Sequence, residues 1–334
     1  MKFLIDKMLK GAAGVLTSAV LLLAAHPLSA QVAASQLEDK ELPVTEFTSL
    51  EIQDDFEVTL AKGAYGVRVT VDKVLSPYVQ VYVKARTLYL AYDSKSVPKD
   101  VKKLYKGKNA PVPVFRAVVY LPELSSVSLS NNAVLTGSDE FAASRFDLTV
   151  VDKAQVKSLA VVADAAHVYL KKNAQAVLNL NVAKALEITT EGSSSVRISG
   201  VADDLGVTSA GSSVIAFTGD SRSVNLSSTN SSQVSLSVRT GKVALNTEGS
   251  SKVTLTGEGD EMTVRGIRNS QVDANNFPVM SVNADLAGSS DVVVTVEKLI
   301  EANLVGGSSL HYTGKPDFKI GKIVKSTLAP YGTK

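Results

Sequence analysis

The segment Gly192-Ser193-Ser194-Ser195-Val196 is the first of seven tight polar turns that each end on an apolar residue. All seven lie between Leu186 and Tyr312, and the closing apolar residues are 18, 20, 19, 19, 20 and 18 residues apart. A fixed period near twenty residues is typical of a solenoid, in which each repeat stacks on the one before it. The closing residues are Val196, Val214, Val234, Val253, Val272, Val292 and Leu310.

Each repeat contains two short strands. In six of the seven repeats, apolar residues stand ten and eight positions before the closing residue, as Val224 and Leu226 do. In the seventh repeat this pair falls one position later, at Leu205 and Val207. The closing residue, such as Val234, is in most repeats followed two positions later by another apolar residue. A spacing of two is the strand period, so one face of each strand is predicted to point inward.

A serine stands two residues before every closing residue. Gly, Asn and Ser accept the left-handed or hydroxyl-bonded geometry of tight turns, so we predict that these serines form a structural ladder at one corner of the coils. An exposed ladder that binds a ligand is the alternative. The seven serines are Ser194, Ser212, Ser232, Ser251, Ser270, Ser290 and Ser308.

These patterns predict an all-β fold. Coils of about 18–20 residues would stack as a β-solenoid, most simply a right-handed parallel β-helix, and would close a continuous Val, Ile and Leu core. Alternating strands from Phe47 to Tyr92 predict an N-terminal β-meander that caps the end of the stack, because a bare end exposes unpaired strand edges. Aromatic residues make up only 6% of the chain, which suits a narrow interior filled by aliphatic side chains.

The chain begins with the features of a secretory signal. Lys2, Lys7 and Lys10 form a positively charged N-terminal region, and an apolar region extends from Gly11 to Ala25. Small residues that end at Ala30 form the expected cleavage site. A retained membrane anchor is the alternative, but the run is short for a bilayer span. We therefore predict an exported protein, located in the periplasm, at the outer membrane surface or outside the cell, with no transmembrane segment after signal removal.

The predicted organisation follows from these segments. Residues 1–30 are the signal peptide and residues 31–46 a polar lead-in. Residues 47–124 form the N-terminal β-strand region, residues 125–314 the β-helix coils, and residues 315–334 a C-terminal cap or tail. The coil register is blurred within residues 131–190, where the spacing of similar turns is irregular.

A lysine-rich segment interrupts the strand pattern between Lys95 and Lys108. It holds six lysines and one acid, Asp100, and it is a candidate contact for an anionic surface or polysaccharide. A solvated loop is the alternative. The candidate contact residues are Lys99, Lys102, Lys103, Lys106 and Lys108.

Three segments resemble the head GIN domain family of auto-transporter adhesins, which is frequent in exported proteins of Bacteroidetes. They are Phe47-Thr48-Ser49-Leu50-Glu51-Ile52 through Gly63, Leu121-Pro122-Glu123-Leu124, and Gly307-Ser308-Ser309-Leu310-His311-Tyr312-Thr313-Gly314-Lys315-Pro316. The resemblance spans about residues 45–320. It implies a solenoid-like all-β fold and a cell-envelope address, and it implies no catalytic residue. The lysine-rich segment departs from the family pattern.

No residue pattern indicates a catalytic, metal or cofactor site. The chain has no cysteine, which excludes disulfides, thiolate metal sites and the lipidated cysteine of a lipoprotein. His167 and His311 are far apart in coil order, and no zinc-ligand spacing is present. A β-helix lyase or hydrolase would need clustered acids. The acids considered for it are Asp203, Asp204, Asp220, Glu191, Glu248, Glu258, Asp260 and Glu261.

The sequence therefore favours a non-enzymatic envelope protein that acts as an adhesin or surface-binding module. A glycan, a host surface or another envelope component is the expected partner, and many weak contacts along the coils would supply the binding. The formal charge of +2 falls near zero without residues 1–30, so nothing points to nucleic acid. A periplasmic or outer-membrane lipid or small-ligand binder and a polysaccharide-cleaving enzyme are the two alternatives.

Overall fold

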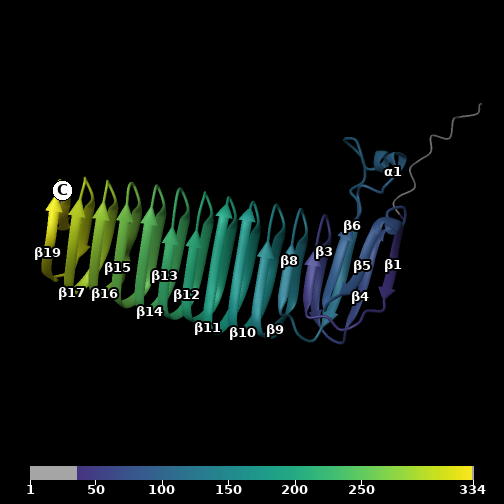
Figure 1. Cartoon of the computed structure of the whole chain (residues 1–334), viewed down its shortest axis with the longest axis horizontal. Coiled ribbons are helices and arrows are strands. Elements are labelled where there is room, and N and C mark those ends of the chain that lie inside the picture. Colours follow the sequence, from purple (N-terminus) through teal and green to yellow (C-terminus); the bar gives the residue numbers. More distant parts are fainter. Residues whose placement is uncertain (1–35, 333–334) are drawn as a thin grey trace, which may run out of the picture. The chain divides into compact units, whose positions relative to one another are not determined.

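The computed structural model describes residues 36–332, and nearly all of their regular structure is β-strand. The chain winds through about 11 stacked turns, which confirms the predicted β-solenoid (Figure 1). The predicted signal peptide, residues 1–30, lies outside the described residues. Among residues 36–332, no helix has the length and apolar content that a membrane-spanning helix requires.

Neighbouring coils pair in parallel along both of their sides. β14 (Gln233–Glu248) pairs with β13 (Val214–Ser228) on one edge and with β15 (Lys252–Ile267) on the other. Each of these strands is long because it follows one side of a coil, bends, and returns along the other side. The other coil strands are β8 (Ser126–Leu129), β9 (Val134–Val150), β10 (Gln155–Lys172), β11 (Gln175–Gly192), β12 (Ser195–Ser209), β16 (Gln271–Ala287), β17 (Asp291–Val305), β18 (Ser309–Thr313), β19 (Asp317–Val324) and β20 (Thr327–Pro330).

The inner faces of the two sides form one continuous core. In β14, Val234, Leu236, Val243 and Leu245 expose 2% of their surface or less. Their partners in register on β15 are equally apolar and equally buried: Val253, Leu255, Met262 and Val264. Burying one such side chain contributes about 1.5–3 kcal/mol relative to leaving it exposed. A coil can bury these side chains only against the coils on either side of it, so stability belongs to the stack.

The register of one coil differs from the prediction by one residue. Ser212 and Val214 are exposed, and Ser213 and Ile215 take the buried positions instead. In every one of the seven repeats, the residue with a left-handed backbone stands four positions before the inward apolar residue, as Gly211 does before Ile215. Val214 and Ile215 are both apolar, so their identity alone does not show which of them points inward.

The corrected register also removes the irregular coil. Leu205 and Val207 now stand ten and eight residues before Ile215, as in the other repeats. The seven inward serines, one per coil, are all buried, which contradicts the alternative of an exposed ligand-binding ladder. We call this set the serine ladder: Ser194, Ser213, Ser232, Ser251, Ser270, Ser290 and Ser308.

The serine ladder closes the turn in each coil from the inside. The hydroxyl of Ser213 donates a hydrogen bond of 2.8 Å to the carbonyl of Ala210, three residues earlier, and Ser232 bonds Thr229 in the same way. In the preceding coils the same buried position holds Ala133, Ala154 and Ala174. This change from serine to alanine explains why the repeat is hard to see within residues 131–190.

The N-terminal region is divided differently from the prediction. β2 (Ser49–Ile52) and β3 (Glu57–Lys62) form the first coil, since they pair in parallel with β8 and β9. On their other edge they pair in parallel with β6 (Thr87–Tyr92) and β7 (Phe115–Leu121). Residues 63–125 are therefore inserted between the first coil and the second, which hides the repeat from a local reading of the sequence.

Antiparallel pairing is confined to the outer strands of this end. β5 (Val79–Lys84) pairs with β6, β4 (Gly66–Asp72) with β7, and β1 (Leu37–Leu42) with β4. Two short helices complete the region, η1 (Ser76–Tyr78) and α1 (Lys99–Leu104). A β-strand cap is thus present, but the expected meander is limited to these outer strands.

The C-terminal segment continues the stack. β19 pairs in parallel with β17, and β20 with β18, so residues 317–330 extend the coils and do not fold over the end as the expected cap. The alternation of Phe318 and Ile320 with polar residues continues the strand period, which accounts for the difference.

The matched pair Ser213 and Ser212 tests the corrected register. Ser213→Ala should lower the free energy of unfolding by about 1 kcal/mol, because it removes a buried hydrogen bond from a position whose backbone also accepts alanine. Ser212→Ala should change it by less than about 0.5 kcal/mol, as expected of an exposed site. Urea denaturation followed by circular dichroism measures both. The reverse order would show that Ser212 is the buried serine.

Candidate functional site

The predicted lysine contact is a projection from the N-terminal end of the stack. Residues 93–114, which we call the lysine projection, connect β6 to β7 and carry α1 (Figure 1). Asp100 lies in the first turn of α1 and Lys102 and Lys103 in its last turn, an order that suits the helix dipole. Four of the five candidate lysines are exposed and Lys102 is partly exposed: Lys99, Lys102, Lys103, Lys106 and Lys108.

These five lysines differ from many basic residues of the coils in having no carboxylate partner among the described residues, and from the unpaired coil bases, such as Lys157 and Arg197, in lying close together in the sequence. On the coils, many bases contact a carboxylate of the same or the next coil, as Lys242 does with Glu261 at 3.2 Å and Arg239 with Glu258 at 3.1 Å. Within residues 36–332, no carboxylate lies within 4.0 Å of an ammonium group of the five lysines. Their positive charge is therefore available to a partner.

The base of the lysine projection is held by buried contacts. Val97 exposes 3% of its surface, and Val101 and Tyr105 pack against the core. The carboxylate of Asp72, at the end of β4, is fully buried and accepts a hydrogen bond of 3.0 Å from the backbone N–H of Val114. Burial, with the nearby Asp72 carboxylate, raises the pKa of Tyr105 to about 12. The C-terminal end of the projection is thus fixed to β4, and Val97 and Val101 hold the rest against the core, while its lysines contact solvent.

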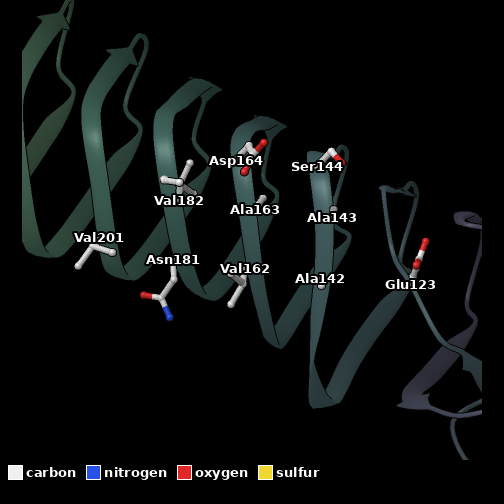
Figure 2. Close-up of a pocket in the computed structure, with 11 residues that line it drawn as sticks. Glu123, Ala142, Ala143, Ser144, Val162, Ala163, Asp164, Asn181, Val182 and Val201 are labelled. Carbon is white, nitrogen blue, oxygen red and sulfur yellow. The ribbon is translucent and has the colours of Figure 1, made fainter.

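A second candidate is a groove where the coils of β9 to β12 bend. It has a volume of about 580 Å³, and Figure 2 shows its side chains coming from consecutive coils. Small apolar residues form much of it, among them Ala142, Ala163 and Val182, with Asp164 at one side. Val162 and Val201 expose 40% and 44% of their surface, so the groove is open to solvent. An enclosed small-ligand site buries most of its ligand, so this groove suits a surface contact instead.

Sequence reasoning missed this groove. Its residues come from four coils and lie about twenty positions apart, in the stretch where the repeat is blurred. The alanines at 142, 143, 163 and 183 are a signal in retrospect, but only the coil register brings them together.

The acids considered for an enzyme are mostly paired with bases. Arg222 contacts Asp203 and Asp204 at 2.9 Å each, and Lys171 contacts Glu191 at 2.9 Å. These partners lower the pKa of Asp203 and of Glu191, the direction opposite to that of a general acid. Glu248 pairs with Arg268, Glu258 with Arg239, and Glu261 with Lys242. Asp220 and Asp260 are exposed on the bends.

The two histidines lie far from each other in the stack. His167 lies in β10 and His311 in β18, several coils apart, and both are partly exposed. In the described part of the chain, no group of three or more His, Cys, Asp or Glu side chains has the arrangement of a metal site.

The sequence matches the family model "Putative auto-transporter adhesin, head GIN domain" over residues 46–219 and 214–316. The chain belongs to this family. The match includes the first coil, the lysine projection, the groove and nearly all of the coils, and it confirms the resemblance seen in the sequence. The family description is that of a binding protein and names no reaction.

Several solved structures are similar to this chain. A "putative adhesin" from Parabacteroides distasonis is 16% identical, with a TM-score of 0.39, and the alignment covers 89% of this chain and 97% of that one. A "putative lipid binding protein" from the same species is 13% identical, with a TM-score of 0.34 and coverage of 88% and 96%. A "putative adhesin" from Parabacteroides merdae is 15% identical, with a TM-score of 0.32 and coverage of 88% and 96%. No curated protein matches this sequence.

The position of Tyr105 in this GIN-domain protein can be tested by titration. Tyr105 should ionise near pH 12, about two pH units above an ordinary tyrosine, because burial and Asp72 both oppose the phenolate. Since the folded-state pKa lies above the unfolded one, its ionisation should weaken the contact only as the pH rises beyond about 10. The difference between the ultraviolet titration curves of the wild type and Tyr105→Phe isolates this group among the ten tyrosines. A difference centred near pH 10 would show that Tyr105 is solvated.

Proposed function

We propose that this protein is an exported, non-enzymatic surface-binding module of the cell envelope, and that its lysine projection binds an acidic polysaccharide. The observation that carries the proposal is the clustering, in the described part of the chain, of five unpaired lysines within ten residues, whereas the unpaired coil bases, such as Lys157 and Arg197, are dispersed over separate coils. Coil bases such as Lys242 and Arg239 contact carboxylates, whereas the five lysines of the projection have no carboxylate within 4.0 Å in the described residues.

An acidic polysaccharide suits the spacing of these charges. Five ammonium groups within ten residues, on a segment that stands apart from the coils, can contact several carboxylates or sulfates of one extended chain. Each exposed contact is weak and is screened by salt, so affinity must come from their number. Lysine presents its charge on a flexible stem, which suits a polymer whose anionic groups are not fixed in one geometry.

The arrangement of the acids supports a role without catalysis. Glycoside hydrolases typically need a pair of carboxyl groups, one of them with a raised pKa. Here Asp203 and Glu191 are ion-paired, and their pKa values are lowered. The adhesin description of the family points in the same direction. Export rests on the predicted signal peptide, and fractionation of cells would test it directly.

Two variants with equal loss of charge test the role of the projection. The first replaces its five lysines with glutamine, and binding to an acidic polysaccharide, measured by interferometry on immobilised polygalacturonate and on heparin, should fall by at least about tenfold. The second replaces five ion-paired coil lysines with glutamine and should lose much less. Its positions are Lys171, Lys172, Lys184, Lys242 and Lys319. Binding of the wild type should weaken steeply between about 0.1 M and about 1 M salt.

Three results would contradict the proposal. Equal losses in both variants would show that total charge, and not the projection, determines binding. Cleavage of the polysaccharide by the wild type would instead support the enzyme alternative. A wild type that binds neither polymer at low salt would remove the acidic polysaccharide as the partner class.

A further inference from the structure

The last coil exposes residues that belong to the core. On β19, Phe318, Ile320 and Ile323 expose 44%, 43% and 40% of their surface. Their partners in register on β17 are Ile300, Ala302 and Leu304, which expose 2% or less. Because residues paired across parallel strands face the same side, these three side chains continue the inner face of the solenoid. Within residues 36–332, no further coil covers them.

The outer edge of β19 is also open. Within residues 36–332, β19 pairs with β17 alone, so the backbone groups on its other edge have no strand partner. Proteins usually prevent such an edge from pairing with another chain by inward charges, proline or a bulge. The inward positions of β19 hold Phe318, Ile320 and Ile323, none of which is charged or a proline. The strand does carry one irregularity, since the pairing with β17 skips Gly321 between Ile320 and Lys322.

The opposite end of the stack is protected. Glu38 and Lys40 on β1 lie opposite Val71 and Val69 of β4, so their charged side chains are on the core side of this edge strand. Lys40 contacts Glu38 at 3.2 Å and donates a hydrogen bond of 2.6 Å to Ser76. Stacking this end on the exposed Ile320 and Phe318 of another molecule would place charges on apolar side chains. A contact between the two different ends of the stack would produce an open fibre, because such a contact does not close. The charges on β1 disfavour this arrangement.

The end that best fits the last coil is therefore the last coil of another copy. It has the same two-sided cross-section and the same exposed aliphatic residues. A two-fold axis across this end can pair β19 either with β19 or with β20 of the second copy. The lysines of β19 distinguish these two arrangements. If β19 paired with β19 of the second copy, Lys319 and Lys322 would approach the same lysines. If each β19 crossed over to β20 of the other copy, these lysines would meet Thr327 to Pro330, which carry no charge.

We propose that the C-terminal coil is the interface of a two-fold symmetric dimer in which β19 of each copy pairs antiparallel with β20 of the other. The two-fold axis runs parallel to the strands, between the two sides of the solenoid. The interface buries Phe318, Ile320 and Ile323 of both copies and pairs the open edge of β19. Because the contact is isologous, it closes at two copies.

Molecular mass in solution tests the dimer and its location. The protein should elute with twice its chain mass in size-exclusion chromatography with light scattering. Ile320→Asp should convert it to a monomer, because a carboxylate would then face the apolar interface without a partner. Val177→Asp is the matched control, since Val177 is equally exposed, at 42%, on a coil far from this end. A monomeric wild type, or a dimer that survives Ile320→Asp, would overturn the proposal.

A single introduced cysteine tests the direction of the axis, since the natural chain has none. Ser326 lies in the turn between β19 and β20, near the proposed axis. The spacing between coils of about 4.8 Å falls within the Cα distance of about 4.4–6.8 Å that a disulfide spans. Ser326→Cys should therefore form a covalent dimer on mild oxidation, whereas the exposed turn variant Ser250→Cys should not. Equal cross-linking of both, or of neither, would contradict this geometry.

Discussion

The parallel pairing of each coil with the next determines the rest of this structure. It pairs the backbone of each interior coil with the coils on both sides and places inward aliphatic residues, such as Leu236, against their equivalents, such as Leu255. A left-handed residue and a buried small residue recur at one corner, because a turn that stacks on identical turns has room for little else. Gly211 illustrates this constraint: with a φ of 81°, an added Cβ would lie 2.5 Å from the carbonyl oxygen of Gly192 in the coil before it.

The same stacking arranges the surface charges. Side chains that point outward at one register position lie side by side in neighbouring coils, so an acid beside a base forms an ion pair, as Arg222 does with Asp203 and Asp204. Exposed pairs of this kind add little stability. The coil bases without a carboxylate partner in the described residues, such as Lys157 and Arg197, are dispersed over separate coils, whereas the lysine projection lies outside this register and gathers five unpaired lysines. The two ends of the stack also differ, with charges turned inward at β1 and aliphatic residues exposed at β19.

Sequence alone predicts the solenoid, its period and its two strands per coil, since these depend on local spacing. It cannot choose between Val214 and Ile215, because both are apolar and only the stacking of Gly211 on Gly192 decides. It also cannot show that β2 and β3 pair with β8 and β9, since residues 63–125 separate them. The sequence also identifies the five lysines as a basic cluster. Whether a carboxylate lies near them depends on residues that are distant in the sequence, so only the structure shows that they are unpaired within the residues it describes. The groove could not be predicted, because its residues come together only through the register of four coils.

Distances between turns test the stacking most directly. Asn132, Ser212, Ser231 and Ser250 are exposed turn residues, and the chain has no cysteine to interfere with labelling. Spin labels at Asn132 and at Ser212, Ser231 or Ser250 should be separated by four, five or six coils, which corresponds to about 19, 24 and 29 Å. Pulsed electron double resonance should therefore give distances that rise by about 4.8 Å per coil. Distances that do not rise with coil number would contradict the stacked solenoid.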